Sequence, residues 1–332
     1  MISYGLFIMS LILGGIGAYF VSRYANKLGL VDIPNERSSH NKPIPKGGGL
    51  GILVAFVVSA YLLKIPLWFW IPVTLLACIS LIGDRFELSP KIRLILQLLA
   101  SIVFLSFLLS HDPSPMSFLR IFHSNFLLIS WLICLVLFMV GTANFYNFMD
   151  GINGIAGITG VSAFGLLASY IHITGGNASL FNLVLCLAIA CVGFLPFNMP
   201  NAKVFMGDVG SILLGFTFAG TVLFLSKNLM DFICLASFLL PFYIDELTTM
   251  YVRLRDHEHL FHPHRRHVYQ ILANEKGFAH WKVSVGYGVL QVLVGMTILL
   301  TRSYGWQVML PVLAGCILSC VLISVGVRRI SH

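Results

Sequence analysis

Polar side chains recur at every third position in the stretch Asn144-Phe-Tyr-Asn-Phe-Met-Asp-Gly-Ile-Asn-Gly154, namely Asn144, Asn147, Asp150 and Asn153. If the segment is helical, residues three apart drift by about 60° per step, so the first three share one flank. Carboxylate and amide oxygens at this spacing suit a hard cation such as Mg²⁺. The asparagines also suit hydrogen bonds between neighbouring helices, and the stretch alone leaves both interpretations open.

A second stretch, Asn201-Ala-Lys-Val-Phe-Met-Gly-Asp-Val-Gly-Ser211, places a lysine and an aspartate just before an apolar run. Small residues around a carboxylate let backbone amides at a helix N-terminus reach phosphate oxygens. We therefore expect Asp208 to hold a metal ion and Lys203 to bind phosphate. The alternative is that Asp208 only caps a helix, which is a common role.

A third stretch, Leu81–Gln97, ends one apolar run with Asp84 and begins the next with Lys91 and Arg93. Asp84, Asp150 and Asp208 thus all lie where apolar runs end. Ionisable groups at the edge of a membrane that face a shared cavity are functional candidates, so we name these three as candidate catalytic acids. The two basic residues also fit a plain role as interfacial anchors.

A fourth stretch, Arg253–Gln270, holds five histidines within eleven residues: His257, His259, His262, His264 and His267. Zinc binding is one interpretation. Anion binding suits the mixture better, because no cysteine lies in the segment and arginine binds phosphate in a bidentate manner. A solvated loop that binds no ligand is the third interpretation. A fifth stretch, Asp32–Gly51, is rich in Pro and Gly and either brings backbone close to a ligand or shapes a turn.

The elements that must position these residues are membrane helices. The 332 residues include only 10% charged residues, and their mean hydropathy is +0.89. Apolar runs of this length predict helices, because hydrocarbon leaves no partner for unpaired backbone groups. We expect an all-α polytopic protein of about eleven spans (ten or eleven) forming a single domain over residues 1–332. The spans are predicted at 2–24, 47–63, 66–83, 92–110, 125–143, 152–172, 180–198, 209–226, 229–248, 281–300 and 305–327.

The distribution of charge predicts the orientation. Of the 21 Lys and Arg residues, only Lys64, Arg120, Lys227 and Arg302 fall in outer segments if the C-terminus is cytoplasmic, which leaves 17 inside. By the positive-inside rule the N-terminus is outside, and the cytoplasmic loops lie near 25–46, 84–91, 144–153, 199–208 and 251–280. This basic face suits anionic head groups or a phosphorylated substrate within the lipid bilayer. No nucleic-acid partner is expected.

With these five stretches in this order, nearly the whole chain resembles the polyprenyl-phosphate N-acetylhexosamine-1-phosphate transferases. The likeness is greatest to the undecaprenyl-phosphate GlcNAc-1-phosphate branch that begins O-antigen or capsule synthesis. The resemblance implies an enzyme of the bacterial inner membrane that moves HexNAc-1-phosphate from a UDP-HexNAc donor to undecaprenyl phosphate and releases UMP. It also implies Mg²⁺ as cofactor, with Mn²⁺ as a substitute, and a homodimer, since family members are often dimeric.

The resemblance assigns roles to individual residues. Asp208 is similar to the family's Mg²⁺ ligand, and Asn147 to an asparagine that shares the metal. Asn153 matches a position near the uracil, and Asn144 is expected to line the same substrate site. Basic residues that match the family's contacts to sugar, phosphate and pyrophosphate are Arg93, Arg265, Arg266 and His267.

The chain departs from the family pattern at two positions. Gly83 precedes Asp84 where the family usually has adjacent aspartates, and Asn153 stands where a second aspartate is frequent. The first departure disfavours a mechanism that needs both acids. Direct attack by the lipid phosphate is therefore favoured over double displacement through an aspartate. A transporter or lipid flippase, a membrane scaffold and an inactive homologue remain alternatives, and the sugar is left open.

Overall fold

The computed structural model describes residues 2–34, 42–86, 88–111, 125–258 and 264–329. Helices dominate these ranges, with one short antiparallel pair of strands in which Val31 faces Pro45. The α-helices and strands in chain order are α1 Ile2–Leu28, β1 Val31–Asp32, β2 Ile44–Pro45, α2 Leu50–Leu62, α3 Leu67–Phe86, α4 Pro90–His111, α5 Asn125–Phe148, α6 Ile155–Thr174, α7 Ala178–Asn198, α8 Gly207–Leu225, α9 Leu229–Ala236, α10 Leu240–Arg255, α11 Val268–Gln270, α12 His280–Thr301 and α13 Trp306–Arg329. The short helical turns are η2 Ser237–Leu239, the π-helical turn η3 Ile271–Glu275 and η4 Arg302–Tyr304.

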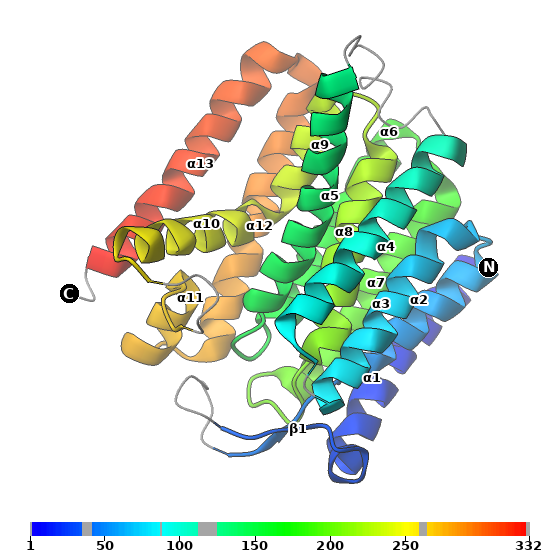
Figure 1. The fold of residues 1–332 in the computed structure, drawn as a ribbon, viewed down its shortest axis with the longest axis vertical. Coiled ribbons are helices and arrows are strands. Elements are labelled where there is room, and N and C mark those ends of the chain that lie inside the picture. Colours follow the sequence, from blue (N-terminus) through cyan, green and yellow to red (C-terminus); the bar gives the residue numbers. More distant parts are fainter. Residues whose placement is uncertain (1, 35–41, 87, 112–124, 259–263, 330–332) are drawn as a thin grey trace.

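The α-helices form a bundle whose long members run roughly side by side (Figure 1). α8 lies at its centre, and every residue from Val209 to Leu223 is buried. It packs against α3 and α5, while α7 packs against α1 and α6. Large apolar side chains remain exposed on the outer faces of α1, α3, α4, α12 and α13, as expected of helices whose solvent is lipid.

The prediction of an all-α polytopic protein with ten or eleven spans is confirmed within the described residues. Ten helices there are long and apolar enough to cross a membrane. The predicted span 47–63 corresponds to α2, which has only 13 residues. At a rise of 1.5 Å per residue it is about 20 Å long, shorter than the hydrocarbon core of about 30 Å. Its first turn is replaced by the glycine-rich segment described below.

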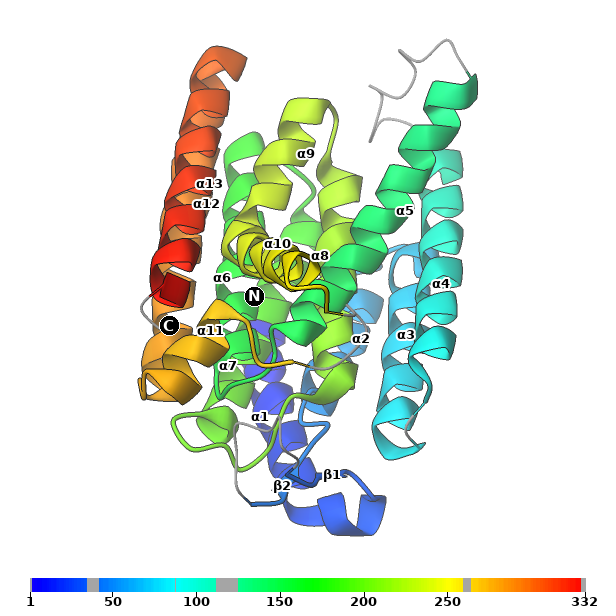
Figure 2. The same ribbon diagram turned by 60° about the vertical axis from the view of Figure 1, so that its left-hand side comes forward.

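The predicted span 229–248 is not one straight helix. It is divided by the 3₁₀ turn Ser237–Leu239 into α9 and α10, and α10 lies across the bundle in both views (Figures 1 and 2). Pro241 stands in the first turn of α10, where its missing amide hydrogen costs nothing but where it cannot continue a straight helix from α9. Helical periodicity alone did not reveal this change of direction.

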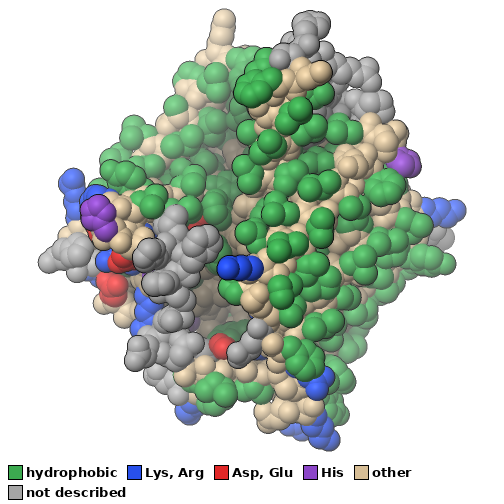
Figure 3. Space-filling model, viewed as in Figure 1, with side chains coloured by type: hydrophobic (Ala, Val, Ile, Leu, Met, Phe, Trp, Pro, Cys, Tyr) green, Lys and Arg blue, Asp and Glu red, His purple; other side chains and the backbone are tan. Residues whose placement is uncertain are grey.

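The connections that carry the five motifs gather at one end of the bundle. The strand pair, the α3–α4 turn, the α5–α6 and α7–α8 loops and α11 all lie toward this end (Figure 2). In the space-filling view, mostly hydrophobic side chains cover α4, α5 and α13, whereas charged side chains lie mainly at the left edge and in the lower half, where a few of them border a hollow (Figure 3). The fold therefore brings motifs that are far apart in sequence to one polar face.

Candidate active site

A pocket of about 310 Å³ opens at this end of the bundle, and all five motifs contribute residues to its wall. Its floor comes from the ends of α3, α5 and α8, and its sides from the strand pair, the α5–α6 loop, α11 and the start of α12. The lining residues are Asp32, Lys46, Asp84, Asn147, Asp150, Gly151, Ile152, Asn153, Phe205, Gly207, Asp208, Gln270 and His280. The three predicted catalytic acids therefore share one cavity.

Asp208, in the first turn of α8, is held from two other helices. The guanidinium Nη1 of Arg93 forms an ion pair with Asp208 Oδ2. Asn147 Nδ2 donates to Asp208 Oδ1 at 2.8 Å and to Ser211 Oγ at 2.8 Å. A carboxylate in the first turn of a helix is favoured by the helix dipole. Asp208 is not the cap itself, because the N-cap of α8 is Met206, without a side-chain cap hydrogen bond. Three predicted site residues from separate motifs thus meet at one carboxylate.

Asp84, near the end of α3, lies under the start of α8, where it is 6% exposed. Val209 N approaches its Oδ2 at 3.5 Å. The neighbouring Gly207 has φ +73°, and a Cβ there would lie 2.8 Å from Asp84 Oδ2 and 2.7 Å from Gly47 N. Only glycine fits such a position, because the left-handed conformation and the close approach both exclude a side chain.

The glycine-rich segment of the fifth motif packs its backbone directly on the second motif. Gly48 N donates to Phe205 O at 2.8 Å, and Gly49 N donates to Met206 O at 2.9 Å. A Cβ on Gly49 would lie 2.4 Å from Gly210 Cα. The close approach predicted for these glycines is therefore made to another backbone segment, and it brings Lys46 to the pocket wall.

Asp150 lies just beyond the end of α5, in the loop that lines the pocket. Its burial, together with the nearby Asp84 carboxylate, raises the pKa of Asp150 well above its ordinary value. Three residues further on, Asn153 Nδ2 donates to Pro200 O at 3.0 Å, and Ser284 Oγ donates to Asn153 O at 2.8 Å. Asn153 is thus fixed at the rim between the α7–α8 loop and α12.

Of the predicted binding residues, only Asn153 lines the 310 Å³ pocket, and Asn144 and Lys203 are among those that lie outside its wall. Asn144 Nδ2 donates to Gln97 Oε1 at 2.5 Å, which is the hydrogen bond between helices that the sequence left open. Asn144 instead lines a small polar cavity beneath Arg93 and Asp208. Lys203 is exposed, and its backbone N donates to Phe197 O at 2.8 Å. Their roles toward substrate stay predictions.

The stretch Arg253–Gln270, called the Arg/His segment below, contributes Gln270 to the pocket wall but none of its charged residues. Arg265 is exposed. Arg266 pairs with Asp256 and, at 2.8 Å, with Glu258 Oε1. His267 is buried, with Nδ1 3.7 Å from Asp245 Oδ1 and Nε2 3.5 Å from Glu246 Oε2. The contacts of these three residues with a donor sugar stay predictions.

Sequence reasoning did not single out Asp32, Lys46, Gln270 or His280 as pocket residues. Asp32 and Gln270 are the end residues of motifs that the sequence did mark, and Lys46 lies within one, next to its glycines. Closer attention to the polar residues of these motifs was the available signal. His280 is the first residue of α12 and carried no such signal. Asn198 was also missed: its Oδ1 accepts from Gly154 N at 2.6 Å and its Nδ2 donates to Val204 O at 2.9 Å, which ties two pocket loops together.

The donor atoms at the pocket fit a hard divalent cation. Asp208 and Asn147 offer carboxylate and amide oxygens, and Asp84 and Asp150 line the same cavity. The described residues contain no group of three or more His, Cys, Asp or Glu side chains that converge as metal ligands. Mg²⁺ needs no such group, since it is usually held by one or two carboxylates plus substrate phosphates and water. For the zinc alternative, His259 and His262 lie outside the described residues.

One family model and several known proteins match large parts of this chain. The family model described as glycosyl transferase family 4 matches residues 66–226. An undecaprenyl-phosphate alpha-N-acetylglucosaminyl 1-phosphate transferase of Pasteurella multocida is 31% identical over 289 residues, which cover 80% of this chain and 78% of the relative. A protein of the same name from Thermotoga maritima is 27% identical over 290 residues, covering 83% and 84%. A probable undecaprenyl-phosphate N-acetylglucosaminyl 1-phosphate transferase of Bacillus subtilis is 29% identical over 219 residues, covering 64% of this chain and 60% of the relative.

Proposed function

The chain belongs to glycosyl transferase family 4, and from this membership we propose that it transfers a sugar 1-phosphate to undecaprenyl phosphate. Relatives in three organisms carry the name of an undecaprenyl-phosphate N-acetylglucosaminyl 1-phosphate transferase. We further propose a UDP-HexNAc donor, with GlcNAc as the first sugar to test, and UMP as the second product. The lipid product would begin O-antigen, capsule or another cell-envelope polysaccharide.

One observation carries the proposal: Asp84, Asp150 and Asp208 line one pocket at the ends of membrane helices, with Asn147 beside them and Arg93 on Asp208. A reaction between a water-soluble nucleotide sugar and a lipid phosphate needs a polar site at the edge of the bilayer. A transporter instead places its site near the bilayer midplane, where both sides gain access in turn. The position of the acids therefore favours a transferase.

Asp208 and Asn147 are the residues that would hold Mg²⁺. When bound, Mg²⁺ supplies neutralisation of the phosphate charges. Arg93 contributes a further positive charge at the same carboxylate, and Lys46 contributes another at the pocket wall. The protein itself binds the phosphates and fixes their relative positions, and these two effects contribute most of the catalysis in phosphoryl transfer.

Direct attack by the lipid phosphate on the β-phosphorus of the donor agrees best with this chemistry. A phosphate monoester has a second pKa of about 6, so the nucleophile is largely dianionic at neutral pH and needs no strong base. The new P–O bond forms as the bond to UMP breaks, and UMP leaves with the electron pair. In the alternative, Asp84 or Asp150 carries a covalent phospho-sugar intermediate. Asp84 is closed in by Gly207 and Val209, which disfavours it as that nucleophile.

The membrane setting is proposed to be the bacterial inner membrane, with the pocket facing the cytoplasm and the N-terminus outside. The basic residues near the pocket end support this orientation through the positive-inside rule. The nucleotide sugar then enters from the cytoplasm. Arg265, Arg266 and His267 shortly precede Gln270, which lines the pocket. We also propose that the protein forms a homodimer, as the family resemblance implies.

The proposal is tested by placing the purified full chain in liposomes with undecaprenyl phosphate and a panel of UDP-sugars. Release of UMP that depends on both substrates, and that stops when EDTA removes divalent cations and resumes with Mg²⁺ or Mn²⁺, supports it. Transport of lipid across the bilayer without UMP release would replace it with a flippase function. Exchange of labelled UMP into UDP-sugar in the strict absence of lipid would overturn direct attack in favour of the covalent intermediate.

A further inference from the structure

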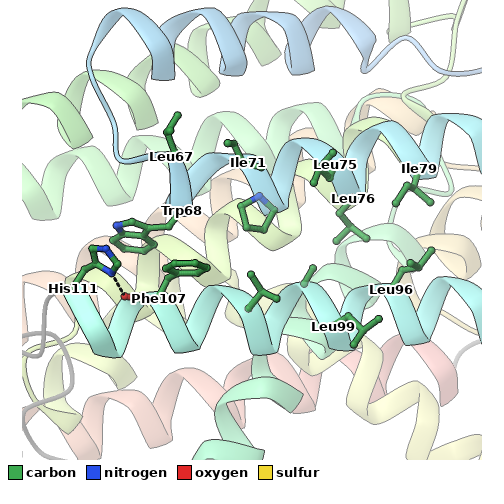
Figure 4. Close-up of a pocket in the computed structure, with 13 residues that line it drawn as sticks. Leu67, Trp68, Ile71, Leu75, Leu76, Ile79, Leu96, Leu99, Phe107 and His111 are labelled. Carbon is green, nitrogen blue, oxygen red and sulfur yellow. Dashed lines mark hydrogen bonds between the residues drawn. The ribbon is translucent and has the colours of Figure 1, made fainter.

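Two hollows of this molecule are built differently. An apolar groove of about 640 Å³ lies between α3 and α4, with Leu75 and Leu99 in its walls (Figure 4). Exposed apolar side chains of this kind are what helices in lipid show in any case, so the groove needs no further explanation. The 310 Å³ pocket differs, because one of its loops is held from behind by a buried tyrosine, Tyr269 of α11.

Tyr269 is fully buried and is not itself one of the residues that line the pocket. Its hydroxyl donates to Phe148 O at 3.0 Å. Burial and the nearby carboxylates, that of Asp245 first among them, raise the pKa of the Tyr269 phenol well above its ordinary value. The hydroxyl therefore stays protonated and remains a hydrogen-bond donor.

The bond from Tyr269 closes the end of α5. Phe148 is the last residue of that helix, and its carbonyl is one of those that a helix C-terminus leaves without a partner in the helix. The residues around Phe148 are those on which the pocket depends, since Asn147 donates to Asp208 at 2.8 Å and Asp150 lines the cavity. Tyr269 thus fixes the point of the backbone from which both side chains are placed.

Gly151 gives a second, independent sign of this fit. A Cβ at Gly151 would lie 2.1 Å from Tyr269 Oη and 3.0 Å from both Cε2 and Cζ of the same ring. Gly151 is not one of the glycines with positive φ, so its backbone would accept alanine and only the tyrosine excludes it. The pocket loop and Tyr269 therefore match at two points, a hydrogen bond at Phe148 and close packing at Gly151.

Tyr269 is held on its other side by α10. Its backbone N donates to Asp245 Oδ2 at 3.3 Å, and Val268 N donates to Asp245 Oδ1 at 2.8 Å. Its ring stacks on that of His267, with the centroids 5.4 Å apart and the planes inclined by 16°. A continuous connection therefore runs from the buried Asp245 carboxylate on α10 to the end of α5.

We infer that Tyr269 is a positioning residue, which sets the end of α5 and through it the places of Asn147 and Asp150 in the pocket. The kinetic part of the inference rests on the proposed function, because that function supplies the reaction whose rate is measured. Tyr269 lies behind the pocket wall. Its loss should therefore slow the chemical step by misplacing other groups, and should change the binding of either substrate little.

Tyr269→Phe removes the hydroxyl and keeps the ring, and Tyr243→Phe is its matched control. Tyr243 OH forms a hydrogen bond of 2.9 Å with Thr142 Oγ1, which is also on α5 but more than one turn before its end. We expect Tyr269→Phe to lower kcat for UMP release about tenfold, with both KM values within about twofold of the wild type. Tyr243→Phe should leave kcat within about twofold. Equal losses of kcat in the two variants, or a change confined to KM in Tyr269→Phe, would overturn the inference.

The packing at Gly151 gives a test that a general loss of stability cannot imitate. Gly151→Ala should lower kcat at least about 100-fold, because its Cβ and Tyr269 Oη cannot both keep their places. Adding Tyr269→Phe removes Oη, so the double variant should be about tenfold faster than Gly151→Ala, although each single substitution is damaging. A double variant as slow as Gly151→Ala, or slower, would show that Tyr269 does not set this loop.

Hydrogen exchange measures the positioning without catalysis. The amides of Met149 and Asp150 are bonded within the last turn of α5, the turn that Tyr269 closes. In the purified full chain, with EDTA and no substrate, Tyr269→Phe should speed the exchange of these amides about tenfold, and Tyr243→Phe should leave it unchanged.

The exchange experiment also separates the two proposals. Unchanged exchange in Tyr269→Phe would contradict the positioning role whether or not the protein converts a UDP-sugar. A wild type that releases no UMP, combined with faster exchange in Tyr269→Phe, would refute the proposed function and leave the structural role of Tyr269 supported.

Discussion

Acidic and basic side chains meet both in the 310 Å³ pocket at the ends of α3, α5 and α8 and in the interior between α10, α12 and α13. In the pocket, Lys46, Asp150 and Asp208 border open space. Between the three helices, Asp245 is 3% exposed and accepts from Tyr287 OH at 2.6 Å and from Val268 N at 2.8 Å. The two regions use the same residue types in different surroundings.

The second region is a closed network. Arg328 Nη2 lies 3.7 Å from Asp245 Oδ1 and donates to Thr249 Oγ1 at 2.7 Å. His267 is enclosed beside Asp245 and Glu246. Such a network fixes α10 across the bundle and holds α11 against it. The comparison teaches that charge alone does not identify a site: the Asp245 carboxylate is buried among donors from α11 and α12, whereas the Asp208 carboxylate, although it is bonded to Arg93 and Asn147, borders the 310 Å³ pocket.

The sharpest test of the pocket is Asp208→Asn, which keeps the side-chain shape and removes its charge. We expect turnover to fall by at least about 1,000-fold, because the carboxylate is the predicted metal ligand and the partner of Arg93. UMP release measures the effect, and size-exclusion profiles verify folding. Glu275→Gln, an exposed acid outside the pocket, is the control. A near-normal rate in Asp208→Asn at ordinary Mg²⁺ concentrations would remove Asp208 from the metal site.

The corresponding test of the closed network is Asp245→Asn. Loss of this buried charge leaves Arg328 and His267 without their shared partner, and breaking a buried pair costs about 3–5 kcal/mol of unfolding free energy. We expect a clear drop in the thermal unfolding midpoint in detergent. Undiminished stability, combined with lost turnover, would show that the network belongs to the active site after all.

Two lysines distinguish the pocket wall from the surface near it. Lys46 lines the pocket, and Lys203, which the sequence favoured, is exposed outside its wall. We expect Lys46→Ala to raise the KM for the UDP-sugar about tenfold, and Lys203→Ala to change it less than twofold. The reverse order would restore the sequence-based assignment of Lys203 to phosphate and extend the donor site beyond the pocket.

The Arg/His segment contacts both regions, because His267 lies beside Asp245 and Gln270 lines the pocket. Substitutions in it test whether the segment binds a substrate or only supports the fold. Arg265→Ala should raise the donor KM about fivefold, lower kcat modestly and leave the lipid KM unchanged. Arg266→Ala should have the smaller kinetic effect, since that side chain is already paired with Asp256 and Glu258. Steady-state kinetics with each substrate varied separately decide this. A dominant defect toward the lipid would assign the segment to the other substrate.

The smallest expected effect concerns pH. The raised pKa of Asp150 means that the folded protein keeps this proton at pH values where the unfolded chain, with a pKa of about 3.9, has lost it. Stability therefore decreases as pH rises from about 4 toward the raised pKa. Asp150→Asn cannot ionise, so it should lose less stability over that range. Thermal midpoints in EDTA across pH 4 to 8 measure the difference, and parallel curves for the two proteins would contradict it.

The sequence by itself determined the class of the protein and identified the three acids that line the pocket. Long apolar runs require helices in hydrocarbon, so the all-α membrane fold was predictable. Asp84, Asp150 and Asp208 were identified because ionisable groups are costly at the edge of a membrane and persist there for a function. Local order along the chain was enough for these conclusions.

Only the tertiary structure decided which polar groups face the cavity. Asn144 and Asn147 are one turn apart on α5, yet the first bonds to Gln97 of α4 and the second reaches Asp208 of α8. His267 and Gln270 are three residues apart, yet one is enclosed by Asp245 and Glu246 and the other lines the pocket. Both outcomes depend on how neighbouring helices pack, including the break at Ser237–Leu239 that turns α10 across the bundle. Contacts between residues distant in sequence set these environments, so the local periodicity of the sequence could not predict them.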